Sequence, residues 1–210
     1  MRLNFLYISD LLCFKGSEIK TSSLELGKNE LLVLGVVSPM EMYLVTEQQF
    51  DHYSDVVAPV IAEAAENADY VLRTKAGDLV LALNEDFWCR AKVVSSINDD
   101  NIEVDLFDLA IIKVVKITDL RKASANVIKY PQMAVKCCLS SWFDKNEKEA
   151  KDEMGDKIQE LVEIYSKVEA IVVENCENVT KVKIDSVEEK LMKKPATLSR
   201  AELLKMRLKK

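Results

Sequence analysis

Two short hydrophobic segments near the start of the chain have the pattern of strands. Residues 30–37 (ELLVLGVV) form a nearly continuous apolar run, and residues 40–46 (MEMYLVT) alternate between apolar and polar side chains. The first pattern is typical of a buried strand and the second of a strand with one buried face. Because only Ser38 and Pro39 separate the two segments, the sequence predicts a β-hairpin.

The hydrophobic period then lengthens to three or four residues. Between residues 50 and 64 the apolar side chains recur at this spacing, which places them on one face of a helix. Pro59 lies inside this segment and lacks the N–H that a helix interior needs, so a kink or a division is expected. Residues 67–69 (NAD) predict the end of the helix.

The middle of the chain has the pattern of a compact β unit. Turn residues at 84–86 and 98–101 separate apolar or alternating runs, and a helical or irregular stretch is expected from Asp119. Strands this short and this closely spaced are typical of a small bent sheet or barrel. The four predicted strands are residues 77–83, 87–94, 102–107 and 111–117.

The last third mixes both patterns. A strand is predicted at residues 133–139, and two more at 168–174 and 180–184. Ser186 with Glu189, and Ser199 with Glu202, fit capping boxes that would open two short helices. The strongest helix is predicted over residues 145–166, with one face lined by Met154, Ile158, Leu161, Val162 and Tyr165.

The chain has 210 residues, of which 49% are hydrophobic and 30% charged, which suits one large or two small domains. Residues 181–210 carry ten Lys or Arg and four Asp or Glu, a net charge of +6. Because the whole chain has a net charge of −6, residues 1–180 have a net charge of −12. An acidic body disfavours a phosphate backbone as ligand and favours a basic partner such as an arginine-rich peptide. The alternative, that the acidity serves solubility, stays open.

The candidate chemistry is sparse. The five cysteines are odd in number and have no CxxC spacing, and His52 is the only histidine, so neither a metal site nor a cofactor is expected. No apolar run approaches the ~20 residues that cross a bilayer, and we expect no signal peptide and no membrane partner. His52 is expected at the solvent edge, and of Cys137 and Cys138 one is expected to be buried.

Several motifs occur in a recognisable order. They include GDLVLA at residues 77–82, WCRA at 88–91, LFDLAI at 106–111, Leu120 with Arg121, and PQMAVKCCL at 131–139. With Ser38 and Pro39 upstream, residues 26–190 resemble an extended Tudor domain. The resemblance implies an α+β, mostly β fold, in which an SH3-like Tudor barrel is inserted into an oligonucleotide-binding/staphylococcal-nuclease-like module and joined to it by a long helix.

The resemblance also implies the boundaries. The Tudor core is expected at about 76–125 and the nuclease-like parts at about 26–70 and 126–190. Residues 1–25 would form a leader and residues 191–210 a basic tail helix.

The departures from the family pattern concern its ligand pocket. Methylarginine-reading Tudor domains use four aromatic side chains and an Asn as a cage, in which cation–π attraction holds the guanidinium. The counterparts of this cage are Leu83, Cys89, Leu106, Leu109 and Ile111, none of which is aromatic or an amide. Ala110 also replaces the motif glycine, so the turn after Asp108 is expected to be remodelled.

The resemblance implies a non-catalytic interaction module that binds an arginine-containing peptide without the usual cage. The partner would be the arginine-rich tail of a Piwi-class Argonaute or another piRNA-pathway protein, in cytoplasmic, perinuclear germ granules. Binding of single-stranded RNA by the oligonucleotide-binding-like half is the alternative, and a nuclease is disfavoured because no arginine pair accompanies the clustered carboxylates. The candidate peptide-binding residues are Leu83, Phe87, Trp88, Cys89, Leu106, Phe107, Asp108, Leu109 and Ile111.

Three of the motif residues also have structural interpretations. Asp108 is expected to hold Arg90 in an ion pair, and Arg121 to be structural. Trp88 is expected to pack between the barrel and the linker helix rather than to form a groove wall, and either Phe87 or Trp88 should be partly exposed.

Overall fold

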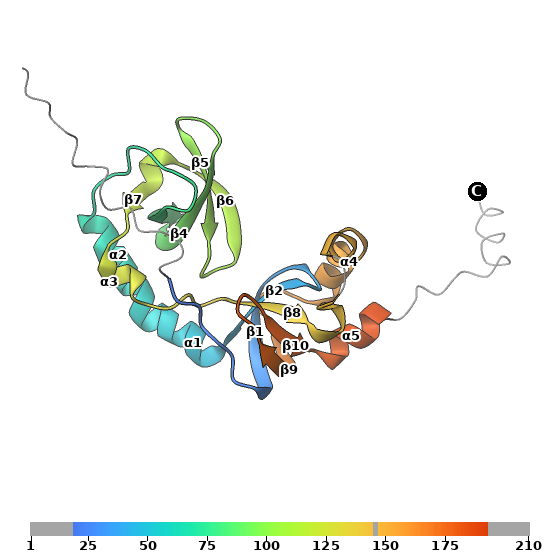
Figure 1. Cartoon of the computed structure of the whole chain (residues 1–210). Helices are drawn as coiled ribbons and strands as arrows, with labels where there is room; N and C mark the ends of the chain where they lie inside the picture. Colours follow the sequence, from blue (N-terminus) through green and yellow to red (C-terminus); the bar gives the residue numbers. More distant parts are fainter. Residues whose placement is uncertain (1–18, 145–146, 193–210) are drawn as a thin grey trace, which may run out of the picture.

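The computed structural model describes residues 19–144 and 147–192 of the chain (Figure 1). The predicted terminal helix beyond Ser199 and most of the expected leader lie outside these residues. None of the described helices is long and apolar enough to cross a membrane.

The first unit, called here the outer barrel, is assembled from both ends of the described chain. Its strands close in the order β1-β2-β8-β10-β9, with β8 and β10 parallel and the other pairs antiparallel. Its interior is filled by aliphatic side chains such as Leu31, Met42 and Val182, and Ile158 of α4 packs against them. The elements are β1 (Gly27–Ser38), β2 (Glu41–Thr46), β8 (Val135–Leu139), β9 (Lys167–Asn175), β10 (Thr180–Lys183), a 3-10 turn at Ser140–Trp142, α4 (Glu147–Leu161) and α5 (Asp185–Met192).

The second unit, called here the inserted sheet, lies between β2 and β8 in the sequence. Its strands follow the order β6-β5-β4-β3-β7, and every neighbouring pair that is connected by a tight turn is antiparallel. Burial alternates along β5, where Ile102, Val104 and Leu106 face the core. The strands are β3 (Leu79–Asn84), β4 (Phe87–Ser96), β5 (Asn101–Leu106), β6 (Ile111–Lys116) and β7 (Leu120–Lys122).

A long helical segment joins the two units (Figure 1). It consists of α1 (Glu47–His52), a π-helical turn (Tyr53–Val57) and α2 (Ala58–Asn67), so the division expected near Pro59 is present. The Ala58 N–H donates to the carbonyl of Tyr53, five residues earlier, and this wider turn is the one that directly precedes the proline. The chain returns through the short helix α3 (Ala125–Ile128).

A shared core fixes the units against each other. It combines Val45 of the outer barrel, Ile61 of α2, Leu81 of the inserted sheet and Val127 of α3. The α+β, mostly β architecture and the predicted hairpin are therefore confirmed. The expected insertion of one β unit into another is also present.

The predicted helix over residues 145–166 is too long at its C-terminal end. Helix α4 ends at Leu161, and Tyr165 has φ +64° and is 61% exposed instead of lining the apolar face. The reason is that the Tyr165 N–H donates to Val33 O (2.7 Å) and Ser166 O accepts from the Val33 N–H (3.0 Å), which turns the chain into β9 beside β1.

Three smaller expectations are also wrong. Helix α5 begins at Asp185, so Ser186 lies inside the helix and does not cap it. The stretch after Ile117 is a 3-10 turn (Ile117–Asp119) followed by strand β7. Cys137 and Cys138 are both buried: Cys137 belongs to the core of the outer barrel, and Cys138 is 2% exposed.

Candidate functional site

The inserted sheet is anchored by an ion pair between Arg90 of β4 and Asp108, which follows β5. The two side chains form a bidentate pair, with Nε 2.8 Å from Oδ2 and Nη2 2.7 Å from Oδ1. Arg90 is 2% exposed and Asp108 is fully buried. The ion pair expected from the sequence is therefore present.

The remaining donors of Arg90 bind the segment that leads back to the outer barrel. Nη1 donates to Val127 O (3.0 Å) and Tyr130 O (2.6 Å), and Nη2 donates to Pro131 O (2.9 Å). All five N–H groups of the guanidinium therefore donate hydrogen bonds, and these offset the cost of removing the charge from water.

The carboxylate of Asp108 is held from a second side. Its Oδ1 also accepts from the Met133 N–H at 2.8 Å. Burial raises the pKa of Asp108, whereas the guanidinium and this N–H lower it. Hydrogen bonds from Arg90 and Met133 to Asp108 therefore connect the loop after β5 to the segment before β8.

The turn after Asp108 keeps the conformation that a glycine would favour. Ala110 has φ +57°, a left-handed conformation that costs an L-residue roughly 1–2 kcal/mol. Ala110 therefore occupies a left-handed position in this turn, where the family motif has glycine. A side chain at Gly35 of β1 would lie 3.1 Å from the Ala110 Cβ, so the turn packs directly on the outer barrel.

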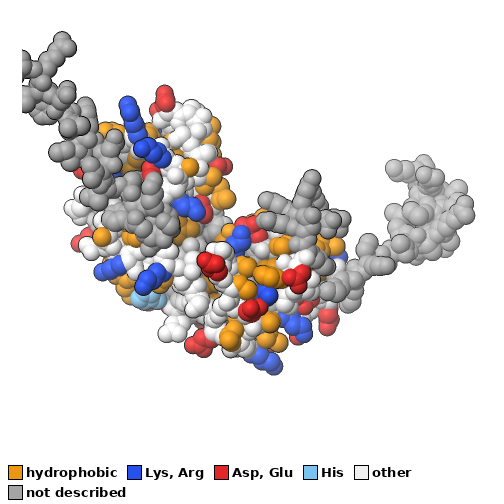
Figure 2. Space-filling model, in the orientation of Figure 1, with side chains coloured by type: hydrophobic (Ala, Val, Ile, Leu, Met, Phe, Trp, Pro, Cys, Tyr) orange, Lys and Arg blue, Asp and Glu red, His pale blue; other side chains and the backbone are white. Residues whose placement is uncertain are grey.

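A groove lies at the junction of the two units and encloses a cavity of about 270 Å³. Its walls come from β4 and β5 of the inserted sheet, from β2 and β8 of the outer barrel, from the segment before β1, and from the β9–β10 turn. Figure 2 shows acidic, basic and hydrophobic side chains together at this junction. The sequence gives no local sign of the groove, because its walls are far apart along the chain.

The charged side chains of the groove come from both units. Lys92 and Asp105 are cross-strand neighbours on β4 and β5, and Lys136 comes from β8. At the barrel wall the Tyr43 hydroxyl donates to Glu41 (2.9 Å), and Lys136 lies 3.6 Å from the same carboxylate. Burial raises the pKa of Asp105, and Asp108 and Glu41 add to this effect, while Lys92 and Lys136 oppose it.

None of the five candidate cage positions lines this groove. Cys89 and Leu106 are fully buried in the core of the inserted sheet, and Leu83, Leu109 and Ile111 are partly buried near them. Burial raises the pKa of the Cys89 thiol to about 12.

Lys113 of β6 lies close to these positions. Its side chain is partly buried, and its ammonium donates to Asn84 Oδ1 (2.8 Å) at the end of β3. The positive charge also lowers the pKa of Cys89, against the effect of burial. The sequence interpretation missed this lysine, although its position between Ile111 and Val115 places it on the inward face of the strand.

The aromatic candidates separate by exposure. Phe107 is buried and lines the groove, Phe87 is 49% exposed, and Trp88 packs at the edge of the shared core with α2. The guanidinium of Arg121 lies over the Tyr70 ring (3.7 Å) and the Trp88 ring (5.0 Å). Both Trp88 and Arg121 therefore have structural contacts, and Phe87 is the more exposed of the adjacent pair.

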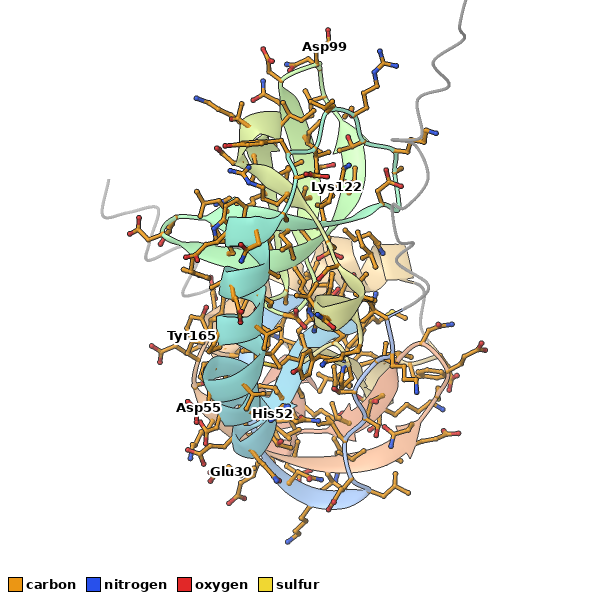
Figure 3. All side chains as sticks on the ribbon, turned by 90° about the vertical axis from the view of Figure 1, so that its left-hand side faces the viewer. Glu30, His52, Asp55, Asp99, Lys122 and Tyr165 are labelled. Atoms are coloured by element: carbon orange, nitrogen blue, oxygen red, sulfur yellow. The ribbon has the colours of Figure 1, made fainter. Side chains whose placement is uncertain are left out.

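His52 is exposed on α1 (Figure 3), and its ring lies 6.4 Å from the Tyr130 ring, measured between centroids. Within residues 19–144 and 147–192, no three His, Cys, Asp or Glu side chains are arranged to hold a metal ion.

Comparison with known structures identifies this two-unit arrangement. The human TDRD1 extended Tudor domain, solved with a symmetrically dimethylated peptide, matches with a TM-score of 0.65 and 18% identity over 82% of this chain and 88% of that chain. The extended Tudor domain of Tudor-SN from Drosophila melanogaster matches with a TM-score of 0.61 and 19% identity over 77% of this chain and 81% of that chain.

A third match is domain TD3 of mouse TDRD1 with a MILI peptide containing dimethylarginine, with a TM-score of 0.62 and 18% identity over 79% of this chain and 86% of that chain. No curated protein sequence matches significantly. The Tudor domain model matches residues 27–141, more than half of the chain. The chain therefore belongs to the Tudor domain family and has the extended Tudor fold.

Proposed function

We propose that this protein is a non-catalytic interaction module that binds an arginine-containing peptide in the groove between the inserted sheet and the outer barrel. The observation that carries the proposal is the cavity itself. Residues of both units line it, and the acidic side chains Asp105 and Glu177 are among them. Structures of similar fold were solved with methylated peptides, which supports a peptide as the class of ligand.

We further propose that the peptide does not enter an aromatic cage. Cys89 and Leu106 are sealed in the core, and the ammonium of Lys113 lies near Cys89. A guanidinium at this place would meet a like charge without an aromatic face to compensate it.

The charge distribution of the outer barrel supports a protein partner over single-stranded RNA. Four of its lysines, Lys136, Lys167, Lys181 and Lys183, each lie within 4 Å of a carboxylate, at distances between 2.7 and 3.6 Å. Lysines that are neutralised in this way contribute little to a cationic path for a phosphate backbone.

The biological partner that fits this proposal is the arginine-rich tail of a Piwi-class Argonaute or of another piRNA-pathway protein. Such a role would place the protein in cytoplasmic, perinuclear germ granules. Both statements extend the peptide-binding proposal through the family to which the chain belongs.

Calorimetric titration with a short peptide of alternating arginine and glycine tests the proposal. Asn178→Trp fills the groove from the exposed β9–β10 turn and is expected to abolish binding. Asp99→Trp introduces the same side chain at the distant tip of the β4–β5 turn (Figure 3) and is expected to leave binding unchanged. Equal binding by both variants and the native chain would place the peptide elsewhere.

A further inference from the structure

We propose that Asp105 is the arginine-binding residue of the groove and that the groove prefers unmethylated arginine. This inference rests on the proposed peptide-binding function and names the residue and the chemical form that it recognises.

The position of Asp105 leaves its carboxylate available. It lies on β5 between the core residues Val104 and Leu106. Its side chain therefore projects from the face of the sheet that is opposite the core, and it lines the cavity. Asp105 is only partly exposed, yet among the described residues its carboxylate accepts no hydrogen bond and lies within 4 Å of no Lys or Arg nitrogen. A half-buried carboxylate without a partner is unfavourable in the free protein and gains from a ligand that donates to it.

The contrast with Asp108 shows what is lacking. Three residues further along the chain, Asp108 accepts two hydrogen bonds from Arg90 and a third from a backbone N–H. Asp105 has the same carboxylate group, but it receives no hydrogen bond from a described guanidinium or backbone N–H. A guanidinium from a bound peptide would supply the bidentate pair that the chain does not supply itself.

Lys92 and Lys136 lie near Asp105 and favour its ionised form, but among the described residues neither forms an ion pair with it. Lys136 lies 3.6 Å from Glu41, whose carboxylate also accepts from the Tyr43 hydroxyl. Lys92, the cross-strand neighbour, is exposed. On the other side of Asp105 lies Ile112 of β6, 65% exposed, which offers an apolar surface for the aliphatic part of an arginine side chain.

The preference for the unmethylated form follows from the hydrogen bonds. Symmetric dimethylation keeps the positive charge but replaces one N–H on each terminal nitrogen with a methyl group, which hinders bidentate pairing with a carboxylate. An aromatic cage compensates this loss through contacts with the methyl groups. The groove wall holds only two aromatic side chains among the described residues, Tyr43 and Phe107. Phe107 is buried with the Arg90 guanidinium over its ring, and the Tyr43 hydroxyl donates to Glu41, so the wall does not form a cage of rings around the methyl groups.

The test is calorimetric titration of the full chain with one arginine–glycine peptide in unmethylated and symmetrically dimethylated forms. We expect the native chain to bind the unmethylated form about tenfold more tightly or better. Asp105→Asn is expected to weaken that binding by about the same factor and to remove the preference. Glu103→Gln removes the same charge two residues away on β5, outside the groove wall, and is expected to change neither.

The outcomes separate the two proposals. If the peptide binds, Asn178→Trp abolishes binding, and Asp105→Asn has no effect, the groove is the site but the assignment of Asp105 is wrong. A native preference for the dimethylated peptide would also overturn this inference. If neither peptide binds the native chain, the proposed function itself fails.

Discussion

Asp108 and Arg90 pair through two hydrogen bonds of 2.7 and 2.8 Å in the interior, at the point where the inserted sheet meets the segment leading to β8. Arg90 also binds three carbonyls of that segment. The pair therefore determines how the two walls of the groove are held relative to each other.

Arg90→Ala is expected to lower the free energy of unfolding by about 3–5 kcal/mol, because it leaves the buried carboxylate of Asp108 without a counter-ion. Urea denaturation measures the change. Lys122→Ala, which removes an exposed ion pair with Asp69 (3.3 Å), is the control and should have a much smaller effect. Similar losses in both variants would show that the buried pair does not hold the units together.

Ala110→Gly is expected to raise the free energy of unfolding by about 0.5–1 kcal/mol, because glycine adopts the left-handed conformation without strain. Gly35→Ala should destabilise the native chain, since its Cβ would lie 3.1 Å from that of Ala110. In the Ala110→Gly background this cost should shrink, and a double-mutant cycle measures the coupling. Strict additivity would contradict the packing described here.

Asp105→Asn is expected to stabilise the protein at neutral pH. The folded-state pKa of Asp105 is raised by burial, so folding is favoured when the carboxyl is protonated and disfavoured when it is ionised. The advantage of the variant should disappear as the pH falls below the usual carboxyl pKa of about 3.9. Thermal unfolding at several pH values measures this, and a variant less stable than the native chain at pH 7 would contradict it.

The cysteines are expected to differ in reactivity. Burial raises the pKa of Cys89 and Cys137 to about 12 and that of Cys138 to about 11, whereas Cys176 is partly exposed on the groove wall. In a Cys13→Ser background, alkylation at pH 8 should modify Cys176 quickly and the other thiols only after denaturation. Rapid modification of Cys89 would mean that the core of the inserted sheet opens easily.

The sequence predicted the strands and their grouping because hydrophobic periodicity is a local property. It also predicted the Arg90–Asp108 pair, through motif resemblance. It could not predict the groove, whose walls include Lys92, Gln132 and Asn178, because only the tertiary fold brings these segments together. The end of α4 was missed for a similar reason, since a long-range pairing between Val33 and Ser166 determines it.

The central claim is that an arginine-containing peptide binds in the groove between the two units. The most direct test is to map the change in backbone amide NMR signals when the arginine–glycine peptide is added. The account predicts that the largest changes occur at groove residues such as Asp105, Gln132 and Lys136, with little change at Asp99. Changes concentrated around Leu83, Leu109 and Ile111, with the groove unaffected, would contradict it.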